Sequence, residues 1–205
     1  MYKYTLFTAV LFTQLFSGYD VGDTMSTEHQ DMEFSYCYPS DSSSTTFSFS
    51  KNTGKVFMLE RSAAWWAPCF DLIPEGEDIY EYWKDDNRVE IIHFLDDYGS
   101  GNYSCTQWGN AGSDGIPPLI DDGTNNTVFS WFENQNDAGL GSLVVFIDHT
   151  MKIIEIFDSA PSFTLTKIKI QNMLVHVPEM SMSLDDKLHL IDSFNIIQLY
   201  PNPFN

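Results

Sequence analysis

The order of apolar and polar residues along the chain predicts four strands in its central and C-terminal parts. Lys55 to Ala63 contains four consecutive apolar residues, Val56 to Leu59, and Arg88 to Leu95 is a second, mostly apolar run. Leu143 to Asp148 is the most continuous apolar run of the chain. A short turn separates it from Lys152 to Phe157, which is predicted to be its hairpin partner.

Two helices are predicted between and after these strands. From Pro68 onward, apolar residues recur at seven- and four-residue spacings and mark one helix face: Leu72, Ile73, Ile79, Tyr80 and Trp83. Pro68 suits a first helical turn, whereas Pro74 and Gly76 are expected to kink this helix. A closing helix is expected from the N-cap residue Ser162 to about Val177.

Shorter segments complete the pattern. Met32 to Tyr38 and Phe47 to Ser50 read as strands that form an N-terminal hairpin extension. Leu119-Ile120 reads as a short strand, and Val128 to Phe132 as a short helix. Strand, helix, strand, helix, hairpin and closing helix form an α/β pattern, with a central mixed β-sheet flanked by helices.

The acidic composition of the chain argues against one class of function, nucleic-acid binding. The chain has 205 residues, 29 of them acidic and 10 basic, for a formal net charge of −19. Such a surface repels phosphate backbones and disfavours nucleic-acid binding. One domain with tails is the simplest organisation for a chain of this length.

The N-terminus predicts export. Lys3 precedes an uncharged, mostly apolar run from Tyr4 to Phe16 and then Ser17-Gly18, as in a secretory signal peptide covering residues 1–18. The run is too short to span a bilayer, which takes about 20 apolar residues. We therefore expect a periplasmic, cell-surface or secreted protein without a membrane span after signal removal.

The segment Trp65-Trp66-Ala67-Pro68-Cys69 carries the candidate chemistry. It stands where the strand ending near Ala63 should give way to a helix. With Val21-Gly22-Asp23, Gly54-Lys55-Val56 and Phe146-Ile147-Asp148, it resembles the exported, TlpA-type branch of the thioredoxin-like redoxins. The resemblance covers residues 19–177. It implies a thioredoxin-like fold, kinship with thiol–disulfide oxidoreductases and an active-site corner formed by these five residues.

Two residues depart from what the resemblance implies. Trp66 occupies the position of the first cysteine of the Cys-x-x-Cys motif, and Ser142 occupies the position expected for the cis-proline. Cys69 then stands at the position of the resolving cysteine, where burial should keep the thiol neutral. Exchange activity is therefore expected to be impaired, and the protein to act on protein thiols weakly or to bind a surface ligand.

Active alternatives remain open at this stage. Cys69 could work with Cys105 as a non-adjacent redox pair, or act alone as a peroxidase. Peroxiredoxins resemble one another in a Thr- or Ser-x-x-Cys element, but Trp66 precedes Cys69 by three residues. Three cysteines, Cys37, Cys69 and Cys105, allow a Cys69–Cys105 disulfide, a Cys37–Cys105 disulfide or three buried thiols.

The last residues resemble the opening of a C-terminal sorting domain. After a polar linker over residues 178–197, the segment 198–205 contains Tyr200-Pro201-Asn202-Pro203-Phe204-Asn205. This hexapeptide resembles the start of the domain that directs export by the type IX secretion machinery. The alternative is a proline-rich tail.

Other constellations are discounted. Paired aspartates lack the spacing of a calcium loop, and the five histidines lack metal-ligand spacing. His93 reads as a core or edge residue of a strand. Trp65, Trp66, Trp108 and Trp131 could line a cleft, but aromatic residues at element ends more often complete a core. No phosphate loop is present, so no cofactor or metal is expected.

Overall fold

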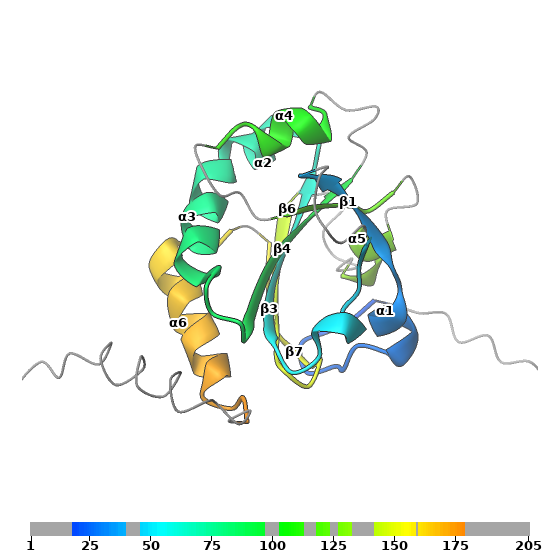
Figure 1. The fold of residues 1–205 in the computed structure, drawn as a ribbon, viewed down its shortest axis with the longest axis vertical. Helices are drawn as coiled ribbons and strands as arrows, with labels where there is room; N and C mark the ends of the chain where they lie inside the picture. The colour runs from blue at the N-terminus through cyan, green and yellow to red at the C-terminus, as the bar shows by residue number, and fades with distance from the viewer. Residues whose placement is uncertain are drawn as a thin grey trace, which may run out of the picture.

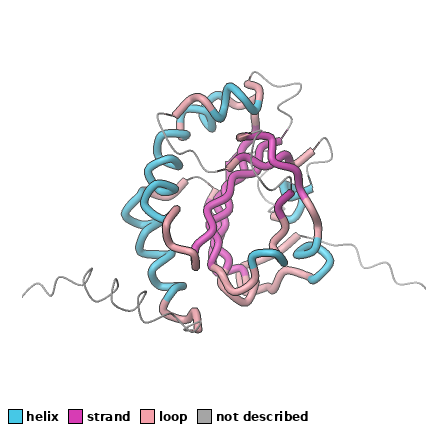
Figure 2. Tube along the Cα trace, viewed as in Figure 1, coloured by secondary structure: helices cyan, strands magenta, loops and turns pink. Residues whose placement is uncertain are grey.

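The computed structural model describes residues 18–39, 46–96, 103–112, 118–123, 127–132, 142–158 and 160–178. Seven strands form one mixed sheet in the order β2-β1-β5-β4-β3-β6-β7. Helices α3 and α6 cover one face of the sheet, and α1 and α5 lie on the other side (Figure 1). Figure 2 shows the same division, with the strands between two groups of helices.

The strand bounds follow the predicted pattern except at Phe47 to Ser50, where the strand ends at Phe47 and Ser50 begins a 3₁₀ turn. They are β1 (Phe34–Tyr38), β2 (Thr46–Phe47), β3 (Val56–Ala63), β4 (Val89–Asp96), β5 (Leu119–Asp121), β6 (Ser142–Ile147) and β7 (Ile153–Phe157). β3, β4 and β5 run parallel to one another, and β6 is antiparallel to both β3 and β7. The predicted mixed α/β sheet is confirmed.

The N-terminal extension is a short hairpin that also joins the main sheet. β1 pairs with β2 through Phe34 opposite Phe47, and with β5 through Tyr36 opposite Ile120. Farther upstream, Met25 and Gly22 donate backbone hydrogen bonds to Met151 and Ile153 beside β7. The N-terminal segment therefore contacts both edges of the sheet.

The helices are α1 (Thr27–Asp31), α2 (Ala67–Asp71), α3 (Ile73–Trp83), α4 (Cys105–Gly109), α5 (Thr127–Trp131) and α6 (Phe163–Leu174), with a 3₁₀ turn η1 (Ser50–Asn52). The helix expected to kink at Pro74 and Gly76 is instead divided at Leu72, which ends α2 and precedes α3. Pro74 lies in the first turn of α3, where its missing N–H costs no hydrogen bond, so it begins a helix instead of bending one.

Three apolar clusters fill the fold. An aromatic-rich cluster lies on the α5 side of the sheet and includes Phe57, Phe94 and Trp131. A second cluster lies under α3 and α6 and includes Met58 and Phe146. The third lies where α2 and α4 meet the sheet, and its members are Ala64, Cys69, Ile73, Leu95, Cys105, Trp108 and Leu119.

Most of residues 1–18, 178–197 and 198–205 lies outside the described residues; Gly18 and Pro178 are the exceptions.

Candidate functional site

The corner between β3 and α2 is built as the sequence predicts. β3 ends at Ala63, and Trp66 donates a backbone hydrogen bond of 3.0 Å to the Ala63 carbonyl. Trp66 has an extended backbone and is the N-cap of α2, and Pro68 lies in the first turn. The Cys69 amide then donates to the Trp66 carbonyl. The indole of Trp66 therefore stands at the helix N-terminus, where thiol exchange would need a sulfur atom.

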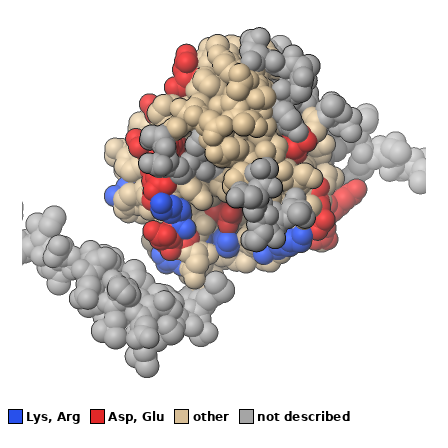
Figure 3. Space-filling view, turned by 45° about the horizontal axis from the view of Figure 1, so that its top comes forward, with Lys and Arg blue, Asp and Glu red and all other residues tan. Residues whose placement is uncertain are grey.

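The two tryptophans of the corner differ in exposure. Trp65 is 45% exposed, whereas Trp66 is half-buried and packs against the cluster that contains Cys69. Figure 3 turns the α2–α4 end toward the viewer, and the upper centre of that face carries no charged side chain. Trp65 is thus an exposed aromatic side chain on the first turn after β3.

Cys69 is a buried thiol and takes no part in a disulfide. Burial raises its pKa to about 11, and the carboxylates of Glu60 and Asp96 act in the same direction. Hydrogen bonds with the Ala63 backbone and the Ser62 side chain oppose this shift but do not cancel it. At pH 7, about one Cys69 in ten thousand would be a thiolate, the form that attacks disulfides and peroxides.

Polar side chains of the central strands lie on the same face of the sheet as Cys69. Glu60 and His93 are register partners on β3 and β4, and the carboxylate lies 3.9 Å from His93 Nδ1. Ser62 donates a hydrogen bond of 3.4 Å to Glu60. Burial lowers the pKa of His93 although Glu60 opposes the shift. His93 Nε2 has no hydrogen-bond partner among the described residues.

The sequence analysis interpreted His93 as a core or edge residue of a strand and did not single out Glu60 or Ser62. A signal was present, because three consecutive polar residues, Glu60 to Ser62, follow the four apolar residues Val56 to Leu59 within one strand. What the sequence could not supply is the register, which sets Glu60 beside His93 across two parallel strands.

Ser142 lies at the end of the sheet that carries the corner. It is the first residue of β6, is buried, and is paired in register with Ser62. Its hydroxyl has no hydrogen-bond partner within the described ranges. Among the described residues, the cis peptide bond is Tyr38–Pro39, at the end of β1. Ser142 therefore lies beside Ser62, one residue before the end of β3, and its equivalence to the cis-proline position stays a prediction.

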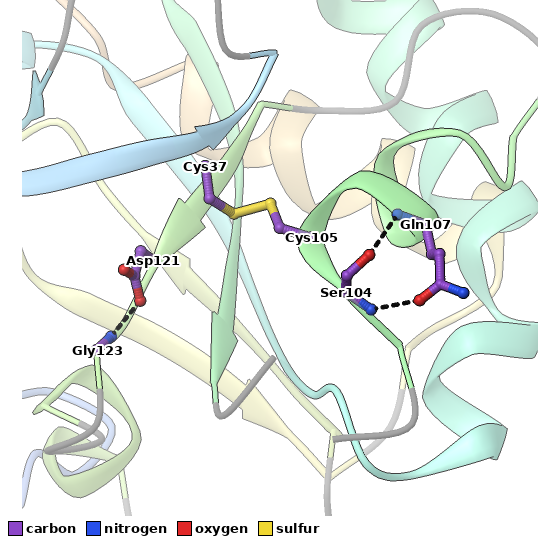
Figure 4. Close-up of a disulfide and its surroundings, with 6 residues drawn as sticks. All are labelled: Cys37, Ser104, Cys105, Gln107, Asp121 and Gly123. Carbon is purple, nitrogen blue, oxygen red and sulfur yellow. Dashed lines mark hydrogen bonds between the residues drawn. A yellow bond between two sulfur atoms is a disulfide. The ribbon is translucent and has the colours of Figure 1, made fainter. Parts of the chain in front are cut away.

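The structure decides between the disulfide alternatives. Cys37 on β1 and Cys105 at the start of α4 form a disulfide with a Cα–Cα separation of 6.0 Å (Figure 4). The Cys69–Cys105 pair is therefore not formed, and the reading of three buried thiols is wrong. β1 pairs with β5, next to the start of α4, and this brings together two cysteines that are 68 residues apart.

Helix α4, which was not predicted from the sequence, has a capped N-terminus and aromatic contacts with α2. Ser104 and Gln107 form a reciprocal capping box at its N-terminus (Figure 4). Tyr103 stacks on Phe70 of α2, with ring centroids 3.8 Å apart, and Phe70 also packs edge-on against Trp108. The Ser-x-x-Gln spacing is a known helix-start signal and could have revealed this helix. α4 thus packs against the corner helix α2.

A second polar cluster lies on the opposite face of the sheet, also at the end of the parallel strands. Asp122, just after β5, accepts hydrogen bonds from the amides of Val128 and Phe129 in α5. Arg61 donates to the Phe129 carbonyl at 2.6 Å, and its guanidinium lies 4.3 Å from the Phe129 ring centre. Burial raises the pKa of Asp122 to about 7. This cluster fixes α5 to the sheet.

The four tryptophans considered as cleft residues do not share one cleft. Trp108 is buried in the cluster under α2 and α4, and Trp131 is buried on the other face of the sheet. Both complete a core, as aromatic residues at element ends commonly do. Trp65 and Trp66 stay at the corner.

Searches of sequence and structure differ in outcome. The chain matches no known protein family, and no curated protein is significantly similar in sequence. Solved structures are similar in fold. A candidate protein disulfide isomerase from Bacteroides thetaiotaomicron superposes with a TM-score of 0.59 and 22% identity, over 77% of this chain and 91% of that one.

Two further structures extend this likeness. A candidate thiol:disulfide interchange protein DsbE from Chlorobium tepidum has a TM-score of 0.55 and 16% identity, over 76% of this chain and 98% of that one. A secreted Mycobacterium tuberculosis disulfide oxidoreductase homologous to E. coli DsbE has a TM-score of 0.51 and 12% identity. The match covers 72% of this chain and 99% of that one. The chain therefore has a thioredoxin-like fold, and its structural neighbours are thiol–disulfide oxidoreductases.

Two negative findings hold for the described part of the chain. Its helices are all too short or too polar to cross a bilayer. Within the same residues, no group of three His, Cys, Asp or Glu side chains is placed to hold a metal ion.

Proposed function

We propose that the protein is an exported thioredoxin-fold binding module, related to thiol–disulfide oxidoreductases, whose exchange activity is weak or absent. The observation that carries this proposal is the environment of Cys69. Its thiol is buried with a pKa of about 11, and Trp66 holds the helix N-cap in front of it. Exchange begins with a thiolate that can reach the substrate, and neither condition is met at this corner.

Trp65 supports a binding role for the same corner. It is 45% exposed beside the half-buried Trp66, and an exposed indole offers a large apolar contact with one polar N–H. The partner would be a protein thiol segment or another surface ligand that docks where substrates of active relatives would dock. In this proposal, Cys69 helps to fill the cluster under α2 and α4 instead of reacting.

Export and domain organisation belong to the same proposal. Residues 1–18 would be a signal peptide, 19–177 the thioredoxin-like domain and 178–197 a linker. Residues 198–205 would open a sorting domain recognised by the type IX secretion machinery. The sequence motifs support these assignments, and the protein would act in the periplasm, at the cell surface or in the medium. Mass spectrometry of the mature protein would locate the signal cleavage site.

The active alternatives need conditions that differ from those observed. A Cys69–Cys105 redox pair would first require the Cys37–Cys105 disulfide to open. A peroxidase would require Cys69 to be a thiolate with a hydroxyl-bearing residue three positions before it, where Trp66 stands. The binding-module proposal requires neither rearrangement.

An insulin-reduction assay with dithiothreitol as the electron source tests the proposal. The wild-type protein is expected to match Cys69→Ala, because the Cys69 thiol takes no part in exchange. Trp66→Cys places a sulfur at the N-cap of α2 and recreates a Cys-x-x-Cys motif, so it is expected to exceed both by at least tenfold.

The three proteins form a matched set, since each retains the Cys37–Cys105 disulfide. A wild-type rate equal to that of an ordinary thioredoxin, lost in Cys69→Ala, would show that the corner is an active site. A separate binding experiment tests the proposed binding role. A ligand found for the corner should bind less tightly to Trp65→Ala, while the folded state stays intact by circular dichroism.

A further inference from the structure

A groove lies at the end of the sheet opposite the corner, between the β6–β7 hairpin and the C-terminal half of α6. Its volume is about 320 Å³, near the lower limit for small-molecule sites. Phe146 of β6 and Met173 of α6 line it and are buried, and Ile154 of β7 is 36% exposed. These three side chains give the groove an apolar lining.

Two of the charged side chains that line the groove form a salt bridge with each other, and a third does not. Lys169 of α6 and Glu155 of β7 form a salt bridge of 2.6 Å, so their charges offset each other. Asp148, which follows β6, forms no salt bridge with another described residue, although His149 follows it in the chain and His176 also lines the groove. The net charge of these three lining residues is therefore negative.

Asp148 is held in place as an ionised acceptor. Its Oδ1 accepts hydrogen bonds from the Thr150 amide at 2.8 Å, the Thr150 hydroxyl at 2.7 Å and the Lys152 amide at 3.1 Å. Burial alone would raise the pKa of Asp148, but these hydrogen bonds, together with the electrostatic influence of His149, outweigh it and the pKa is lowered. Oδ2 has no such partner among the described residues, so one oxygen of a fixed carboxylate remains available.

We propose that this groove binds a small ligand with a short apolar body and one primary ammonium group. The apolar body would lie on Phe146, Met173 and Ile154, and the ammonium group would donate to Asp148. An anionic ligand would meet the negative net charge of the lining and of the whole chain, which carries −19. A neutral apolar ligand would leave the ionised carboxylate without a new partner.

This site is separate from the corner. The corner lies where β3 ends and β6 begins, whereas the groove lies where β6 ends and α6 approaches its C-terminus. The inference does not depend on whether the corner is active, and Cys69→Ala should leave binding at the groove unchanged.

Binding of 2-phenylethylamine, followed by NMR chemical-shift perturbation, tests the inference. The same aromatic body with a carboxylate, phenylacetate, and with a hydroxyl, 2-phenylethanol, provides the comparison. We expect saturable shifts of the Ile154 and Met173 methyl groups with the amine and at least tenfold weaker binding of the other two. Stronger binding of phenylacetate, equal binding of all three, or no saturable binding of the amine would each overturn the inference.

Variants locate the site. Asp148→Asn keeps an oxygen for the Thr150 and Lys152 hydrogen bonds but removes the charge, so amine affinity should fall at least tenfold. Asp158→Asn is the matched control, because it removes one exposed carboxylate just beyond β7 that does not line the groove. Equal losses in the two variants would mean that only overall charge matters and would contradict the proposal.

A filling variant separates pocket binding from surface binding. Asn172 lines the groove from an exposed position on α6, so Asn172→Trp should occupy the groove without disturbing the core. Amine binding is expected to be lost in this variant while circular dichroism stays unchanged. Retained binding would place the amine elsewhere and overturn the proposal.

Discussion

The Cys69 thiol and the Cys37–Cys105 disulfide lie at the same end of the sheet but differ in their chemistry. Cys69 occupies the helix start at which this fold commonly places its redox chemistry, yet its thiol is buried and neutral. Cys37 and Cys105 lie outside that position, yet they form the disulfide. The difference shows that the place of a cysteine in the fold does not decide its chemistry. Cys69 and Cys105 are both buried at helix starts, and they differ because Cys105 has Cys37 within disulfide distance and Cys69 is a free thiol.

The disulfide has a structural role that Cys69 lacks. It joins the N-terminal strand β1 to α4, in the segment between β4 and β6. In that segment, the disulfide holds α4, β5 pairs with β4 and β1, and Arg61 and Asp122 hold α5. The segment between β4 and β6 is therefore expected to respond to substitution differently from the corner.

Removal of the disulfide should have the largest effect. A link between residues 68 apart stabilises a protein by about 4 kcal/mol through the entropy of the unfolded chain. We therefore expect Cys37→Ala with Cys105→Ala to lower the free energy of unfolding by about that amount in urea denaturation. Cys69→Ala, which only removes a small buried side chain, should cost about 1–2 kcal/mol. A larger loss in Cys69→Ala would reverse the comparison.

The contact of Asp122 with α5 should make the stability of the protein depend on pH. Asp122 has a pKa of about 7 in the folded protein and an ordinary pKa near 3.9 when unfolded, so the folded state binds the extra proton between these values. Stability should fall as pH rises from about 4 to 7, by up to about 1.4 kcal/mol per pH unit. Asp122→Asn should remove this contribution to the slope. Urea denaturation between pH 5 and 7 measures the free energy of unfolding of both proteins. The same pH dependence in the wild type and in Asp122→Asn would contradict the raised pKa of Asp122.

The contact of α4 with β1 should tolerate no added methyl group. A Cβ atom at Gly109 would lie 2.3 Å from the base of the Tyr38 ring, so the ring or the helix would have to move. Gly109→Ala is expected to lower the free energy of unfolding by about 1–3 kcal/mol. Thermal denaturation measures the loss, and a neutral effect would show that α4 is seated loosely on β1.

A glycine-to-alanine substitution in α3, near the corner, should stabilise the protein, in contrast to Gly109→Ala. Gly76 lies inside α3, and an added Cβ would meet only Glu60 Oε2 at 3.4 Å. Because alanine favours a helix interior over glycine, Gly76→Ala should raise the free energy of unfolding by up to about 1 kcal/mol. A loss of stability would mean that Glu60 cannot yield and that its contact with α3 is tighter than an ordinary one.

The strands and the corner were predictable because their signals are local. Val56 and its neighbours form a short apolar run after a turn, and Pro68 marks a helix start wherever it occurs. The closing helix was predicted from Ser162, and the structure begins it at Phe163. The break at Leu72 was missed, because a proline at the start of a second helix looks like a proline that kinks one.

The parts that could not be predicted depend on partners distant in sequence. Cys37 meets Cys105 only because β1 adds to the sheet beside β5, and no local pattern states that pairing. Likewise, the register of β3 and β4 sets Glu60 against His93. The exposure of Trp65 also comes from packing and not from the motif that contains it.

Alkylation of the native, unreduced protein tests the central claim most directly. Cys37 and Cys105 are joined, so Cys69 is the one cysteine that iodoacetamide could modify, and mass spectrometry reports it without interference. The account predicts that Cys69 at pH 7.5 is modified at least 100-fold more slowly than in the urea-unfolded protein, because burial both shields the sulfur and keeps it protonated. Modification at a similar rate in both states would contradict it.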